Sequence, residues 1–147
     1  MNTIFDTTTY KDFQQRLNQL NASSAPLWGK MNVAQMLAHC NQALEMSLGK
    51  IELEMKSNIF MRWIVKPMVL SKKPFSQNLP TSTGFIIADE REFEKEKQRI
   101  AKNIEEAYKR GLEGDWKPHI AFGKLKPEEW GHLTYKHLDH HFRQFGV

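Results

Sequence analysis

The chain has 147 residues, of which 40% are hydrophobic, and its formal net charge is +4. This length predicts a single domain over residues 1–147 with one buried core, and the composition excludes a disordered or collagen-like chain. The single cysteine, Cys40, excludes both an internal disulfide and a cysteine-based zinc site.

Two amphipathic helices are predicted in the first third of the chain. Apolar residues recur with the period of a helix over residues 10–20, and a loop that contains proline and glycine follows. The second helix is predicted over residues 33–48. Asn32 can cap its start, Gln35 can complete a capping box, and Gly49 is a natural stop.

The middle of the chain has a less regular pattern. Residues 59–70 are apolar, and they predict either a short helix that ends at Pro67 or a packed irregular segment. Two prolines and a glycine predict a loop over residues 71–88, with an extended piece at residues 85–88.

Two further helices follow, and together the helices predict the fold class. One is predicted over residues 90–110, with Asp89 as its cap and basic residues in its last turn. The other opens with Pro127 and runs to about Gln144. Four substantial helices with almost no strand pattern predict an all-α four-helix bundle, and the long middle connection favours a crossover.

The segment over residues 56–73 is basic and apolar, and it allows two interpretations. It carries five lysine and arginine residues among aromatic and methionine side chains, and it has no acidic residue. It could form a flap that attracts an anionic substrate or docks on a membrane surface. A short buried helix whose lysine side chains reach out to water is the interpretation that we favour.

The histidines are clustered in a way that suggests a metal site. His137 and His141 are four residues apart on a predicted helix, so their rings point the same way from adjacent turns. His140 faces a different direction. His39 is the best candidate for a third ligand, because it lies beside the apolar face of the helix over residues 33–48 and ligands in bundles come from facing helices. Three histidines with open positions suit Zn²⁺, Ni²⁺ or Fe²⁺.

A purely structural interpretation competes with this metal site. Two histidines four residues apart often occur by chance on a helix surface, and no acidic residue is obviously placed to complete the ligand set. A single histidine beside an apolar face, as His39 is, is usually a core residue that forms hydrogen bonds.

Several segments together resemble a known family. They are Trp28-Gly29-Lys30-Met31-Asn32-Val33-Ala34-Gln35-Met36-Leu37-Ala38-His39, Phe122-Gly123-Lys124-Leu125, Glu128-Glu129-Trp130-Gly131 and His137-Leu138-Asp139-His140-His141-Phe142-Arg143-Gln144. In this combination the chain resembles the DinB/YfiT-like superfamily over nearly its whole length. It is most similar to an uncharacterised branch in which the second and third segments precede the last helix.

The resemblance implies a fold, a site and a class of chemistry. The implied fold is a four-helix bundle with up-down-down-up topology. The implied divalent metal is held by one histidine of the second helix and two of the last, which here are His39, His137 and His141. Relatives that use low-molecular-weight thiols imply a metal-dependent hydrolase or thiol transferase that acts on a small molecule. A metal-free, non-catalytic bundle with a binding or stress-related role is the alternative.

Four further residues are candidates for the surroundings of the site. Gln144 could orient a ligand, although a solvated residue near the C-terminus is an equal alternative. Trp28 and Trp130 are expected to wall the end of the bundle. His119 could line the mouth of the site, although we favour a histidine on a surface loop.

The expected partners and location follow from what the sequence lacks. No nucleic-acid motif is present and the charge is modest, so we expect no nucleic-acid partner. No apolar run is long enough for stable membrane insertion, and the first residues lack the pattern of a signal peptide, so a cytoplasmic location is expected. A homodimer is compatible with the sequence.

Overall fold

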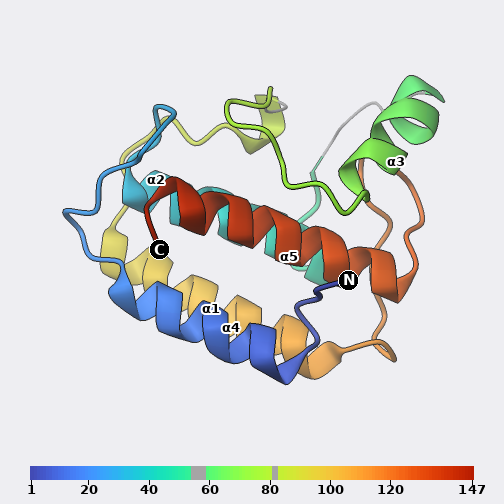
Figure 1. Ribbon diagram of the computed structural model, residues 1–147, viewed down its shortest axis with the longest axis horizontal. Coiled ribbons are helices and arrows are strands. Elements are labelled where there is room, and N and C mark those ends of the chain that lie inside the picture. The colour runs from blue at the N-terminus through green and yellow to red at the C-terminus, as the bar shows by residue number, and fades with distance from the viewer. Residues whose placement is uncertain (54–58, 81–82) are drawn as a thin grey trace.

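The computed structural model describes residues 1–53, 59–80 and 83–147. Within these ranges the regular structure is helical and no strand occurs, although His119 and Gly123 form an isolated antiparallel bridge. The predicted all-α class is therefore confirmed. Four long helices form the body of the molecule in Figure 1: α1 (Thr7–Gln19), α2 (Val33–Leu48), α4 (Phe93–Arg110) and α5 (Pro127–Gln144).

The four long helices lie side by side, and consecutive helices are not always neighbours. Helix α1 contacts α4 and α5, and α2 contacts the same two helices. Figure 1 shows that α1 and α5 run in one direction, whereas α2 and α4 run in the other. Because α2 and α4 run the same way, the chain between them returns along the length of the body. This arrangement places α2 directly against α5, the two helices that carry the candidate ligands.

Local sequence explains where α2 and α4 begin. Asn32 caps α2: its side-chain oxygen accepts from the Gln35 N–H at 2.9 Å, and the Gln35 side chain accepts from the Asn32 N–H at 3.0 Å. Helix α4 begins at Phe93, so the predicted cap at Asp89 is wrong. The Asp89 carboxylate instead accepts from the Arg91 guanidinium, in the non-helical stretch that precedes α4.

The crossover between α2 and α4 contains short helical pieces. A π-helical turn, η1 (Met61–Val65), continues into α3 (Lys66–Val69), and a 3₁₀ turn, η2 (Thr83–Phe85), follows later. Pro67 lies in the first turn of α3 and does not end the helix, because a proline is tolerated there. The predicted extended piece at residues 85–88 is not a strand, and its first residue ends η2.

The outer face of η1 and α3 is exposed, contrary to the favoured prediction of a buried helix. Trp63 is 74% exposed and Met68 is 61% exposed, whereas Met61 and Val69 face the interior of the molecule. The segment is therefore a short amphipathic cover over part of the body. Lys56, at the start of the predicted basic segment, lies outside the described residues.

The buried side chains form two clusters. The larger one fills the space between the four long helices, where Phe13, Leu37, Ile100 and Phe142 are almost completely buried. The smaller one gathers around Trp130, between α2, α5 and the crossover. In the part of the chain that the structure describes, no helix has both the length and the apolar character needed to cross a membrane.

Candidate metal centre

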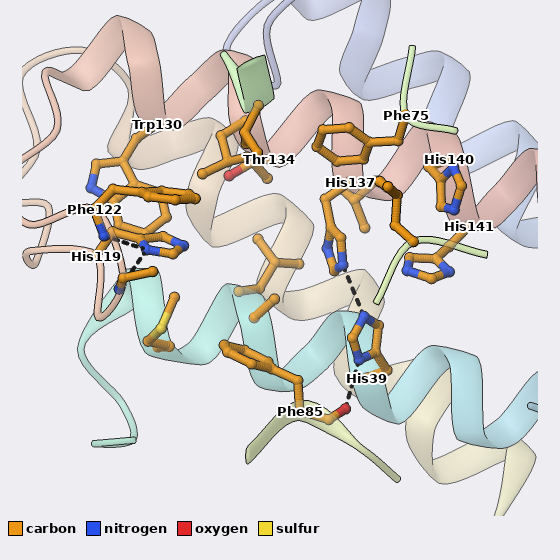
Figure 2. A pocket seen from close by; sticks show the side chains of 18 of the residues that line it. His39, Phe75, Phe85, His119, Phe122, Trp130, Thr134, His137, His140 and His141 are labelled. Atoms are coloured by element: carbon orange, nitrogen blue, oxygen red, sulfur yellow. Dashed lines mark hydrogen bonds between the residues drawn. The ribbon is translucent and has the colours of Figure 1, made fainter. Parts of the chain in front are cut away.

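Three histidine side chains from two helices meet beside the crossover (Figure 2). His39 projects from α2, and His137 and His141 project from successive turns of α5. One nitrogen of each ring lies within 4.8 Å of the others, and the Nε2 atoms of His39 and His137 are 2.9 Å apart. The structure thus brings together the three residues that the sequence singled out as ligands.

The outer nitrogens of two of these rings are held by hydrogen bonds. Nδ1–H of His39 donates to the Phe85 carbonyl oxygen at 2.9 Å. Nδ1–H of His141 donates to the side-chain oxygen of Gln144 at 2.8 Å. Because each acceptor places the single proton of the neutral ring on Nδ1, the Nε2 atom carries none. Its lone pair is therefore available at the centre of the triad. Gln144 is buried and oriented as a support for His141, and it is not a solvated terminal residue.

A tight loop before α2 positions the Gln144 amide. The Gln144 Nε2 atom donates to the Trp28 carbonyl oxygen at 2.7 Å. This hydrogen bond identifies the amide atom that faces His141 as the oxygen, Oε1. Gly29 has a φ of +83°, and a Cβ atom there would lie 2.5 Å from the Gln144 nitrogen. A glycine at this position is therefore needed for the close approach of the loop to α5.

Burial keeps the three rings neutral. It lowers the pKa of His39, although the hydrogen bond to Phe85 partly opposes this change. Burial also lowers the pKa of His137, with further lowering from the neighbouring His141 and His39, and it lowers the pKa of His141 to about 3. Neutral imidazole is the form that binds a metal, so these rings need not release protons near neutral pH.

The triad fits a transition-metal ion by its donor chemistry. Three neutral imidazole nitrogens are a common ligand set for such ions, and the outer hydrogen bonds of His39 and His141 are typical of histidine metal sites. A tetrahedral ion would need its ligand nitrogens to be about 3.3 Å apart. Small rotations of the three side chains would bring the ring nitrogens to this spacing. His140 is not one of the three ligand candidates. Its ring centre lies 5.0 Å from that of His141, and its ring also contacts those of Trp28 and Phe75.

The triad forms one end of a pocket of about 290 Å³. The pocket continues along α5 to Trp130, and Figure 2 shows the aromatic rings between α5, α2 and the crossover. Most of the wall is apolar and includes Met46, Met61, Phe75, Phe122, Trp130 and Leu133. A small molecule with an apolar body would be shielded from water there.

The remaining predicted residues occupy different places around this pocket. Trp130 lines it, whereas the Trp28 ring lies against His140 with ring centres 5.7 Å apart, and the Trp28 backbone carbonyl accepts from Gln144. His119 is not a free surface residue: it is half-buried, lines the pocket and stacks on Phe122 with ring centres 4.4 Å apart.

Sequence reasoning missed the contribution of the crossover. The Phe85 carbonyl holds His39, and the Phe75 ring faces His140, yet both residues belong to a segment without a helical pattern. A backbone carbonyl carries no signal in the sequence, so this partner could be found only from the fold.

Comparison with known proteins places the chain in a family without giving it an activity. No curated protein and no solved structure matches it. A family described as "Protein of unknown function (DUF1569)" matches residues 5–146, nearly the whole chain, and the protein therefore belongs to this family.

Proposed function

We propose that this protein is a metal-dependent enzyme with the three-histidine site of the DinB/YfiT-like superfamily. Its proposed activity is that of a hydrolase or a low-molecular-weight-thiol transferase acting on a small molecule. The observation that carries the proposal is the convergence of His39, His137 and His141 at one end of a largely apolar pocket. The opposite directions of α1 and α2 and the long crossover before α4 support the same up-down-down-up bundle.

Each group around the site has a role in this proposal. His39, His137 and His141 would hold Zn²⁺, Ni²⁺ or Fe²⁺ through their ring nitrogens. The Phe85 carbonyl and the Gln144 amide would fix the ring orientations. A bound ion would supply a Lewis acid that lowers the pKa of a thiol or a water molecule. The apolar wall would bind the body of the substrate and exclude bulk water.

One contact favours the alternative, a metal-free bundle with a binding or stress-related role. His39 donates through Nδ1, so its neutral ring can accept at Nε2. His137 lies 2.9 Å away and can donate to it. This hydrogen bond would satisfy both rings without an ion, as in a structural core pair.

Metal content distinguishes the two proposals. We expect purified protein incubated with Zn²⁺ or Ni²⁺ at pH 8 to retain about one ion per chain after gel filtration, as measured by elemental analysis. His39→Ala and His141→Ala should lose the ion because each removes a ligand nitrogen. His140→Ala is the matched control and should retain it. Failure of the parent protein to bind either metal would favour the metal-free bundle.

A further inference from the structure

The end of the pocket opposite the triad contains a polar group that a metal site would not use. Nδ1 of His119 accepts from the backbone N–H of Ala121 at 3.0 Å and from that of Phe122 at 3.3 Å. A nitrogen that accepts hydrogen bonds carries no proton, so the proton of the neutral ring is on Nε2. Burial and the nearby charge of Lys66 lower the pKa of His119 to about 4, which keeps the ring neutral.

Within the described part of the chain, the Nε2–H group of His119 has no hydrogen-bond partner, so it can donate to a ligand. Among the described residues, both hydrogen bonds of the ring belong to Nδ1. Figure 2 shows the second ring nitrogen of His119 on the side of the ring away from the hydrogen bonds to Nδ1, toward the interior of the pocket. A ligand that covers this donor without accepting from it would leave the donor unsatisfied, which costs free energy.

Neighbouring rings hold this donor in one orientation. The His119 ring stacks on Phe122 with an interplanar angle of 14°, and it lies 5.4 Å from the Trp130 ring. Trp130 is itself fixed, since its indole N–H donates to the Lys117 carbonyl oxygen at 3.0 Å. A donor held in this way is ready to bind without a large loss of conformational entropy.

The spacing between the two ends sets the size of the ligand. Trp130, beside His119, and His137, in the triad, are seven residues apart on α5. A helix rises about 1.5 Å per residue, so the two ends are separated by about 10 Å. The wall between them includes Leu133, Ala121 and Met46, and it offers mainly apolar surface.

We propose that His119 forms a second binding subsite, which recognises a carbonyl-type oxygen on an apolar, ring-sized body through its Nε2–H group. The subsite would fix the end of the substrate that is remote from the triad, and it would thereby select molecules that carry a hydrogen-bond acceptor there. It deepens the proposed function by naming a substrate class, and it rests on that function only for the chemistry at the triad.

Two probes of the same shape test the subsite in metal-free protein. Methyl naphthyl ketone carries a carbonyl oxygen, and isopropenylnaphthalene has a CH₂ group in its place. In the presence of a chelator, we expect the ketone to bind about tenfold more tightly than the alkene, because the alkene would cover the Nε2–H group without accepting a hydrogen bond from it. Affinities would be measured by the quenching of tryptophan fluorescence or by calorimetry.

Two variants separate recognition from folding. His119→Phe keeps an aromatic ring but removes the donor, so it should bind both probes with affinities within about twofold of each other. His132→Phe is the matched control, because His132 is also buried but is not among the residues that line this pocket. Its ring nitrogens lie beside the backbone carbonyls of Asn2 and Ser71. It should keep the preference for the ketone.

Nitrogen NMR of the parent protein provides a readout that needs no variant. We expect the proton of His119 on Nε2, and we expect its resonance to move on addition of the ketone but not of the alkene. A proton on Nδ1, equal affinities for the two probes, no binding of either, or a preference that survives in His119→Phe would each overturn the subsite. Probe binding without metal binding would instead contradict only the proposed function.

Discussion

At the scale of single residues, the candidate centre depends on groups that do not themselves face a substrate. Gln144 joins His141 to the Trp28 carbonyl, so one amide fixes both the proton position and the direction of a ligand ring. Gly29 permits this contact because its missing side chain leaves room for the amide. His119 shows the same principle, since two backbone N–H groups decide which ring nitrogen donates.

Replacing Gln144 tests this support directly. We expect Gln144→Leu to weaken Zn²⁺ or Ni²⁺ binding by about 10- to 100-fold, because His141 loses the acceptor that orients its ring. The measurement is a titration against a chelator of known affinity. Gln14→Leu, on the exposed side of α1, is the control and should leave the affinity unchanged. An unchanged affinity in Gln144→Leu would mean that the amide does not support a ligand.

At the scale of elements, α5 is held from both ends by segments far away in the chain. Near its start, the Ile4 N–H donates to the Gly131 carbonyl oxygen at 3.1 Å. At its end, the Leu27 N–H donates to the Gln144 carbonyl oxygen at 2.7 Å. These contacts set the position of α5 relative to α2, and hence the position of His137 and His141 relative to His39.

Gly131→Ala tests the first of these contacts. Alanine normally stabilises a helix relative to glycine, by about 1 kcal/mol. Here a Cβ atom would lie 2.2 Å from the Thr3 hydroxyl oxygen and 2.5 Å from the Phe5 ring. We therefore expect a loss of about 1–3 kcal/mol in the free energy of unfolding, measured with urea. Gly84→Ala, where nothing lies within 4 Å of the added atom, should change it little. A stabilised Gly131→Ala protein would show that the N-terminal segment moves aside.

At the scale of the whole molecule, the burial of neutral histidines couples folding to pH. An unfolded histidine has a pKa of about 6.5. The folded protein lowers the pKa of His141 to about 3 through burial, and it lowers those of His39 and His137 as well. Below pH 6.5 the unfolded chain therefore binds more protons than the folded one, so stability falls as the pH falls from 6.5 toward 3.

Urea unfolding of the metal-free protein would measure this coupling. Between pH 7.5 and pH 5.5 we expect His141 alone to account for a loss of about 1 kcal/mol in the free energy of unfolding. His39 and His137 should add losses of the same sign. His141→Phe should show a shallower decline than the parent. A free energy of unfolding that does not change over this range would contradict the burial of neutral rings.

The sequence by itself determined the existence of the four long helices and the shared direction of one histidine pair. The start of α2 at residue 33 and of α5 at residue 127 follow from local chemistry, namely the Asn32 capping box and the Pro127 first turn. The spacing of His137 and His141 puts both on one face of α5 for the same reason, because helix geometry depends only on nearby residues.

Only the tertiary structure decided what stands opposite that pair. The packing of α2 against α5 brings His39 to it, and the crossover supplies the Phe85 carbonyl. The fold also turned His119 into the pocket and left the outer face of η1 and α3 exposed, against the favoured predictions for both. Such contacts join residues up to about a hundred positions apart, and they are set by how all the apolar faces are buried together, which no local pattern records.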